Sequence, residues 1–153
     1  MDPITAKLMA AAGAAKEATY VDDVFSTFLH EGTGSAQTIT NGIDISGEGG
    51  MVIIKNRPRS IDGFFTFDTE RGTNKYIRTN LANAEQTSTS ILTAFSSTGF
   101  SIGTSGSSNR SGDGYVSWTF RKCPGFFDVV TYTGTGSVQN ISHSLGSAPG
   151  SIW

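Results

Sequence analysis

One eight-residue motif occurs twice in the sequence, at a distance of 102 residues. Residues 32–39 read GTGSAQTI and residues 134–141 read GTGSVQNI, so six of the eight positions are identical. The match extends outwards, since Phe25 aligns with Phe127 at the same offset. A period of this length is too long for a solenoid repeat and is typical of a small domain repeated in tandem.

The repeat divides the chain into four predicted segments. They are an N-terminal docking helix (1–18), a connector (19–23), a first β-sandwich module (24–122) and the start of a second, incomplete copy (123–153). The second copy would hold only its first strands, and strands without partners expose apolar side chains and open edges. We therefore expect the native polypeptide to continue past Trp153.

Composition narrows the class of protein. The hydrophobic fraction of 37% and the charged fraction of 16% are both low, and Gly, Ser and Thr fill the difference around ten Phe. This composition favours an all-β protein with many turns. A net charge of −2 with dispersed basic residues offers no footprint for nucleic acid. The sequence has no apolar run of about 20 residues, so we expect no membrane insertion. The single cysteine, Cys123, cannot form an internal disulfide.

The N-terminal residues 3–17 carry the one long helical pattern. Asp2 is a candidate N-cap, Pro3 suits the first helical position, and alanine favours the helix. A narrow apolar stripe runs along it and consists of Ile4, Leu8, Ala11, Ala12 and Ala15. Because a helix of this length is marginal alone in water, we predict that the stripe docks onto another protein. A frayed terminus, or a helix lying on its own domain, remains the alternative.

From Val24 onwards the apolar pattern has period two, which predicts short β-strands in a β-sandwich or jelly roll. The strand candidates are 25–30, 36–39, 51–55, 64–67, 91–95, 100–103, 115–121 and 126–132. Residues 80–86 favour a single helical turn, and residues 105–114 form a polar loop. In the strand at 115–121 polar and apolar side chains alternate, and the apolar face, with Trp118, is expected to face the core.

Five stretches resemble a recurrent domain of tailed-bacteriophage virion proteins, the tail-fibre and structural proteins common in marine phages. They are FDTERG (67–72), GFSIG (99–103), NRS (109–111), YVSW (115–118) and FFDVVTY (126–132). The resemblance covers residues 22–153, and in those proteins Gly-Thr-Gly-Ser frequently opens each repeated copy. This chain departs from the pattern at Gly49-Gly50, where relatives often have Pro-Gly.

The resemblance implies a phage virion structural protein, in particular the virion-attached N-terminal part of a tail fibre that links the tail to host-recognition regions. It implies a homotrimer in the virion tail, assembled in the host cytoplasm, whose N-terminal helix contacts other tail proteins. It brings no catalytic residues. We expect no enzymatic activity, no cofactor and no metal.

Two alternatives of another class stay open, a carbohydrate-binding module for host-surface glycans and the non-catalytic part of a polysaccharide depolymerase. The polar loop supplies four candidate glycan contacts, which are Asn109, Arg110, Asp113 and Tyr115. Loops at one end of a sandwich commonly carry binding function. The carboxylates of Asp68 and Glu70 could serve glycoside hydrolysis, but Arg71 beside them favours an ion-paired turn.

Overall fold

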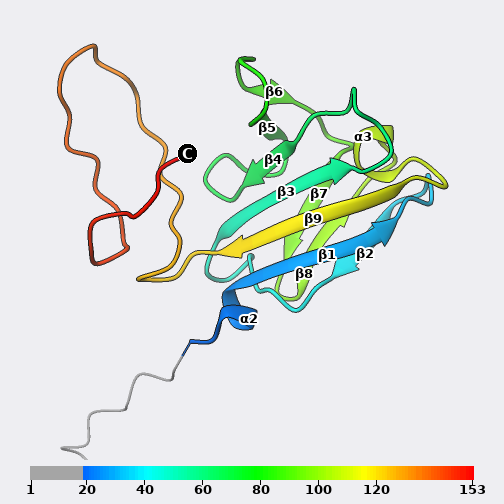
Figure 1. Cartoon of the computed structure of the whole chain (residues 1–153), viewed down its shortest axis with the longest axis horizontal. Coiled ribbons are helices and arrows are strands. Elements are labelled where there is room, and N and C mark those ends of the chain that lie inside the picture. Colours follow the sequence, from blue (N-terminus) through cyan, green and yellow to red (C-terminus); the bar gives the residue numbers. More distant parts are fainter. Residues whose placement is uncertain (1–18) are drawn as a thin grey trace, which may run out of the picture.

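The computed structural model describes residues 19–153, which fold into a β-sandwich with two antiparallel sheets (Figure 1). The larger sheet has six strands in the order β1-β9-β3-β4-β5-β6, and the smaller has three in the order β2-β8-β7. The predicted mainly β fold is confirmed. The predicted helix at residues 3–17, with its docking stripe, lies outside the described residues.

The elements are short, as the sequence predicts. The large sheet contains β1 (Phe25–Glu31), β3 (Gly50–Asn56), β4 (Phe65–Asp68), β5 (Lys75–Arg78), β6 (Gln86–Thr87) and β9 (Gly114–Arg121). The small sheet contains β2 (Gln37–Thr40), β7 (Leu92–Ser96) and β8 (Gly99–Ile102), and two short helices are α2 (Val21–Val24) and α3 (Gly106–Asn109). The first seven predicted strands are confirmed. The helical turn at residues 80–86 is wrong, because this stretch crosses to β6, which pairs with β5.

The first two strands of the sandwich pair with its last two. Among the described strands, β1 is hydrogen-bonded only to β9 and β2 only to β8. Phe25 lies opposite Phe120 in the first pair, and Gln37 lies opposite Ile102 in the second. The first two strands of the module therefore depend on strands that are about sixty to ninety residues later in the chain. This dependence on later strands explains why the C-terminal segment, described below, forms no strands of its own.

The core lies between the sheets and draws on both. Its members are at most 7% exposed; they are Ile39, Ile43, Ile45, Val52, Ile54, Phe65, Phe67, Tyr76, Ile91, Leu92, Phe100, Ile102 and Tyr115. Phe65 and Phe67 sit two apart on β4, so both point inwards. Each buried phenylalanine contributes about 1.5–3 kcal/mol through its removal from water.

The buried face of strand β9 is the one that the sequence predicted to be exposed. The buried side chains are Tyr115, Ser117 and Thr119, whereas Trp118 is on the outer face and partly exposed. The buried hydroxyls are satisfied: Thr119 Oγ1 accepts a hydrogen bond from Asn41 Nδ2 at 2.8 Å. Ser117 and Thr119 occupy the inner face of β9, and neighbouring strands supply most of the apolar core. Trp118 therefore does not belong to the core.

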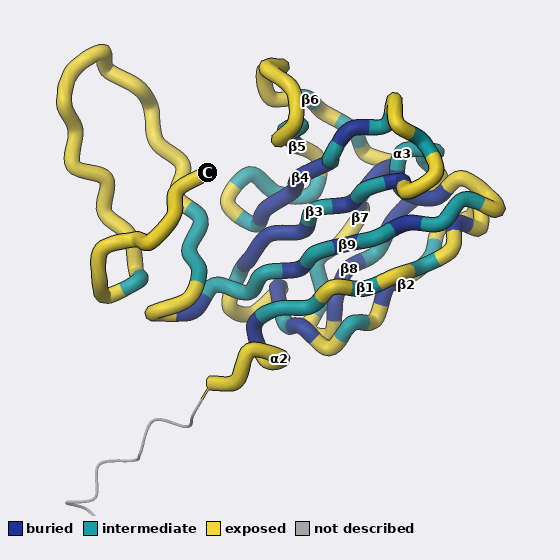
Figure 2. Tube along the Cα trace, viewed as in Figure 1, coloured by how far each residue is buried: buried dark blue, intermediate teal, exposed yellow. Residues whose placement is uncertain are grey.

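Residues 126–153 contain no strand, so the strand predicted at 126–132 is wrong. The segment loops away from the sandwich in Figure 1 and is exposed over most of its length in Figure 2. Its sequence corresponds to β1, β2 and the start of β3. The equivalents of β8 and β9, which pair with these strands in the first copy, are not among residues 126–153.

Candidate functional site

The polar loop at residues 105–114, which holds candidate glycan contacts, is hydrogen-bonded to other parts of the module. Asn109, at the end of α3, is completely buried. Its Oδ1 accepts hydrogen bonds from the Thr33 backbone N–H and from Gln37 Nε2, both at 2.8 Å. Its Nδ2 donates to the Gly103 carbonyl at 2.7 Å and also to the Ser35 carbonyl. Asn109 thus holds the Gly-Thr-Gly-Ser loop between β1 and β2 against the loop that precedes β9.

The glycine of this loop is required by close approach. A Cβ added at Gly32 would lie 2.1 Å from the Arg110 carbonyl oxygen. Gly32 N–H donates to the Asp113 carbonyl, and the Gly112 N–H donates back to the Gly32 carbonyl at 3.0 Å. The repeated motif that opens each copy is therefore one half of a loop-to-loop latch, which we call the Asn109 latch. The sequence repeat marked its glycines but gave no indication of Asn109 as their partner.

Tyr115 is also buried and holds the same loop. Its hydroxyl donates to the Gly106 carbonyl at 2.8 Å and accepts from the Arg110 backbone N–H at 2.8 Å. Burial is the main cause that raises the pKa of Tyr115, so the phenol stays protonated. Because Asn109 and Tyr115 present no free surface, the expectation that these two residues contact a glycan is not met.

Asp113 and Arg110 lie at the surface of this loop. Asp113 accepts hydrogen bonds from Asn56 Nδ2 at 2.9 Å and Arg59 Nε at 2.6 Å, and these bonds lower the pKa of its carboxyl. Arg110 Nε lies 3.6 Å from the same carboxylate, and about half of the Arg110 side chain is exposed. Of the four candidate glycan contacts, Arg110 is thus the one with a largely accessible side chain.

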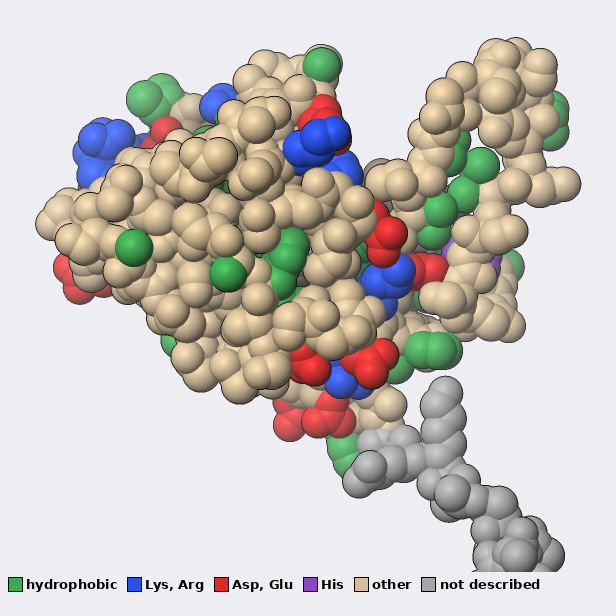
Figure 3. Space-filling view, turned by 180° about the vertical axis from the view of Figure 1, so that it is seen from behind, with side chains coloured by type: hydrophobic (Ala, Val, Ile, Leu, Met, Phe, Trp, Pro, Cys, Tyr) green, Lys and Arg blue, Asp and Glu red, His purple; other side chains and the backbone are tan. Residues whose placement is uncertain are grey.

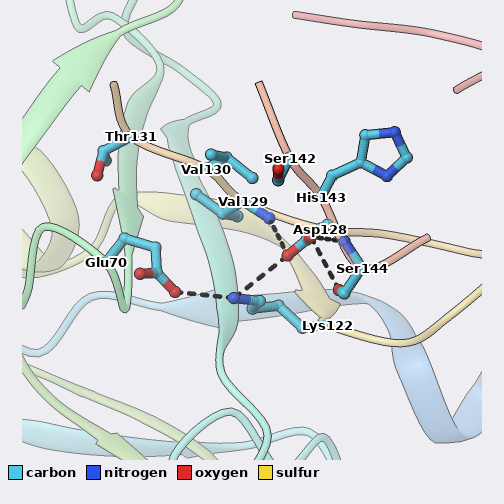
Figure 4. A pocket seen from close by; sticks show the side chains of 9 residues that line it. All are labelled: Glu70, Lys122, Asp128, Val129, Val130, Thr131, Ser142, His143 and Ser144. Carbon is cyan, nitrogen blue, oxygen red and sulfur yellow. Dashed lines mark hydrogen bonds and ion pairs between the residues drawn. The ribbon is translucent and has the colours of Figure 1, made fainter. Parts of the chain in front are cut away.

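A second cluster ties the C-terminal segment to the sandwich (Figure 4). Lys122, just after β9, places its Nζ 2.8 Å from Glu70 Oε1 and 3.2 Å from Asp128 Oδ1. Asp128 Oδ2 accepts hydrogen bonds from the Ser144 backbone N–H at 2.7 Å and the Ser144 hydroxyl at 2.8 Å. An open cavity of about 360 Å³ lies beside these groups, and His143 is on its lining.

The charge state of Asp128 follows from these contacts. Its partial burial raises the pKa, but the hydrogen bonds from Ser144 and Lys122 outweigh that effect and lower the pKa to about 2. The hydrogen bond to Glu70 is the main cause that raises the pKa of Lys122. Both groups therefore stay charged across the neutral range. The arrangement fits a structural tie better than a group that exchanges protons during a reaction.

Acidification is expected to loosen this tie. Because the folded pKa of Asp128 is depressed, its stabilising contribution is present above the ordinary value of about 3.9 and is lost as pH falls towards 2. An NMR titration of the Ser144 amide should show a midpoint near 2, and Asp128→Asn should remove that transition. Glu48→Gln, at an exposed turn, should change nothing. A Ser144 midpoint near 4 would contradict the tie.

The outer face of the large sheet is the most distinctive surface of the sandwich. On β9 it bears Val116, Trp118 and Phe120. The strand register places Leu29 and Phe25 of β1 beside the first and last of these. Leu29 is 60% exposed and the other four are partly exposed. An aromatic and aliphatic surface of this kind commonly marks an interaction site.

Further aromatic contacts extend this outer apolar face. Phe25 and Phe120 lie 4.9 Å apart between ring centroids, and Phe64 stacks on Trp118 at 6.0 Å. The C-terminal segment covers one end, where Phe127 lies 5.1 Å from Phe120 and Trp153 meets the same ring edge-on at 5.6 Å. The sequence reading missed this face because it placed Trp118 in the core.

The outer face of the small sheet has a different character. Thr38 and Ser101 face each other across β2 and β8, with their hydroxyl oxygens 3.1 Å apart. Figure 3 views the molecule from this side, where charged and hydrophobic side chains are both few over most of the sandwich. The two outer faces of the sandwich therefore differ, one being apolar and the other hydroxyl-rich.

Comparison with protein families assigns the chain to one of them. Residues 21–153 match a family described as a domain of unknown function, DUF7483. The chain belongs to this family. Comparisons with curated proteins and with solved structures find no match. The DUF7483 match begins at α2 and runs continuously through the sandwich and the C-terminal segment.

Within residues 19–153, no helix is long and apolar enough to cross a membrane. The same residues contain no cluster of three or more His, Cys, Asp or Glu side chains that could hold a metal ion.

Proposed function

We propose that the chain is a non-enzymatic structural component of a phage tail, namely the virion-attached N-terminal part of a tail fibre. In this role it links the tail to regions that recognise the host. The observation that carries the proposal is the outer apolar face on β1, β9 and β3. A protein that connects other proteins needs such contact surfaces on a rigid body.

The chemistry of the outer apolar face fits a protein interface. Interface centres are enriched in aromatic residues and depleted of charge, and charged groups lie at the rim. Phe25 and Trp118 lie within the face, with Ile53 opposite Trp118. Lys55 and Glu31 lie towards the end of the strands, beside Val116 and Gly114. The face therefore has an apolar centre and a charged margin.

The ion pairs of the sandwich fit a shape-holding role. Asp68 is buried and accepts from the Arg71 backbone N–H at 2.9 Å and from Arg71 Nε at 2.6 Å. Glu70 points instead to Lys122. These carboxylates fix the turn after β4 and the exit from β9, as predicted for an ion-paired turn. Their charges stabilise the connections that position the strands.

The location in a virion rests on the resemblance of residues 22–153 to phage virion domains. The same resemblance supports a homotrimer that is assembled in the host cytoplasm. Attachment to other tail proteins is assigned to the stripe of residues 1–18. This division of roles gives the sandwich a linking function and gives the N-terminal segment the anchoring function.

Deleting residues 1–18 tests the anchoring role. We expect the melting temperature of the sandwich to stay nearly unchanged, because its core is built from residues 39–115. Incorporation into particles, measured by immunoblot of purified virus, should be lost. Ala12→Asp should reduce incorporation more mildly, because it places a charge on the apolar stripe. The anchoring role fails if the deletion unfolds the sandwich or if the shortened protein assembles at normal levels.

Leu29→Lys tests the outer apolar face. Leu29 is already 60% exposed, so stability should change by less than about 0.5 kcal/mol. Incorporation into particles should fall, because a charge would replace an exposed apolar side chain of the proposed interface. The matched control is Thr38→Lys, at an exposed position of β2 on the hydroxyl-rich face, and it should assemble normally. Equal assembly of both variants would remove the outer apolar face from the proposal.

Glycan binding is a second candidate, favoured by one observation. An open cavity of about 350 Å³ lies beside the β1 end of the sandwich and is lined in part by His30, Glu31 and Arg57. Such side chains can hydrogen-bond sugar hydroxyls. A glycan array with the whole chain should give a signal that Arg57→Ala abolishes if this role is correct. An array without any signal would reject it.

A further inference from the structure

The C-terminal segment keeps the local shape of the first copy although its strands are absent. Gly136 has φ +74°, and its counterpart Gly34 has φ +75°. Gln139 Nε2 donates to the Thr133 carbonyl at 3.2 Å. The equivalent bond in the first copy, from Gln37 Nε2 to the Glu31 carbonyl, is 3.1 Å long. The loop that connects the first two strands of a module therefore forms without the rest of that module.

The tertiary partners of that loop are missing from the second copy. In the first copy the Asn109 latch occupies the space next to Gly32 so closely that a Cβ would lie 2.1 Å from a carbonyl oxygen. At Gly134, the counterpart of Gly32, an added Cβ would meet nothing within 4 Å in the described chain. Glycine is needed at this position only where another backbone approaches.

The apolar side chains of the second copy are exposed where those of the first are core. Ile39 is 3% exposed, and its counterpart Ile141 is 38% exposed. Val52 is completely buried, and its counterpart Ile152, aligned after a two-residue gap, is 86% exposed. These positions carry large apolar residues that residues 19–153 leave in contact with water. They match positions that form part of the core in the first copy, and the described residues supply no side chains that bury them in the second.

We propose that residues 126–153 are a strand-donor segment that folds on a polypeptide with the sequence pattern of residues 54–122. That acceptor supplies the equivalents of β8 and β9 together with an asparagine that closes the second latch. The inference concerns assembly of the fold and stands independently of the proposed place in a virion.

A second copy of this same chain is not the acceptor. Its β9 is already paired with its own β1, and its β8 with its own β2. Displacement would need an intermolecular segment to outcompete strands that are covalently attached and therefore present at high effective concentration. The acceptor must offer free equivalents of β8 and β9.

The test is a fusion protein in which residues 54–122 are appended directly after Trp153. A reference fusion carries residues 24–122 twice and measures the protection of a fully matched second module. We expect amide exchange at residues 127–133 and 139–142 to slow by about 100-fold or more relative to the 153-residue chain. Exchange that stays as fast as in the 153-residue chain, while the reference second module is protected, would overturn the proposal.

Gly134→Val tests the second latch without affecting the folding of the first module. In the 153-residue chain it should leave the melting temperature unchanged, because its side chain meets open space. In the fusion protein it should abolish the protection of residues 127–142, because the side chain would meet the acceptor backbone. Equal tolerance of Gly134→Val in both proteins would overturn the latch. Protection of residues 127–142 that rises with the concentration of the unfused chain would instead indicate strand exchange between copies and would also overturn the proposal.

Discussion

Replacing Asn109 by alanine is expected to destabilise the sandwich by about 3–4 kcal/mol. The side chain is completely buried and joins the Gly-Thr-Gly-Ser loop to α3 and to Gly103, directly after β8. Its loss leaves the Thr33 N–H and the Gly103 carbonyl without their side-chain partner, while the Ser35 carbonyl keeps its hydrogen bond from the Thr33 hydroxyl. Each net hydrogen bond is worth about 1 kcal/mol, and buried groups left unpaired cost more.

Urea unfolding followed by circular dichroism measures this loss. Asn140→Ala is the matched control, because Asn140 is exposed in the second copy of the motif, and it should stay within about 0.5 kcal/mol of the native chain. The two variants remove the same side chain from the same protein. If Asn109→Ala unfolds at the same urea concentration as Asn140→Ala, the Asn109 latch does not stabilise the fold.

A methyl group at Gly32 is expected to cost about 3 kcal/mol, whereas the same change at Gly134 is expected to cost almost nothing. The Cβ of Gly32→Ala would lie 2.1 Å from a backbone oxygen, so two loops must separate to admit it. Gly134 faces open space in the described chain. Thermal unfolding of the two variants compares identical substitutions at equivalent positions of the repeat. Equal melting temperatures would contradict the close approach of the loops.

The strands of the sandwich could be predicted because their apolar residues recur with period two. Seven predicted strands match β1–β4 and β7–β9 in position. Strands β5 and β6 escaped prediction for a physical reason. In β5, Lys75 and Arg78 enclose Tyr76 and Ile77, and β6 has only two residues, so neither gives an alternating pattern. Their pairing is a product of tertiary packing.

The orientation of β9 shows where alternation is ambiguous. Alternation divides the side chains of a strand between two faces but does not say which face is buried. Trp118 is the more apolar choice for a core, yet Tyr115 is the buried residue because its hydroxyl has three hydrogen-bonding partners. Those partners lie outside β9: Gly106 begins α3, Arg110 directly follows it, and Asn56 ends β3. A pattern within one strand cannot reveal them.

The candidate site was predicted in part. The repeat located the Gly-Thr-Gly-Ser loop, and the sequence predicted the polar loop before β9 but assigned it glycan contacts. Their contact through Asn109 joins residues more than seventy positions apart, which local pattern cannot show. The segment 126–153 was predicted to contain strands from its similarity to the first copy. Strands need partners, so similarity of sequence alone did not produce them.

The central claim is that this sandwich is a structural part of a phage tail, and antibody labelling of purified particles tests it most directly. An antibody raised against residues 24–122 is applied to intact virus and viewed by electron microscopy, with the infected-cell lysate blotted in parallel. We expect gold label at the tail of the particles. Particles that carry no label, in a preparation whose lysate contains the protein, would contradict the claim.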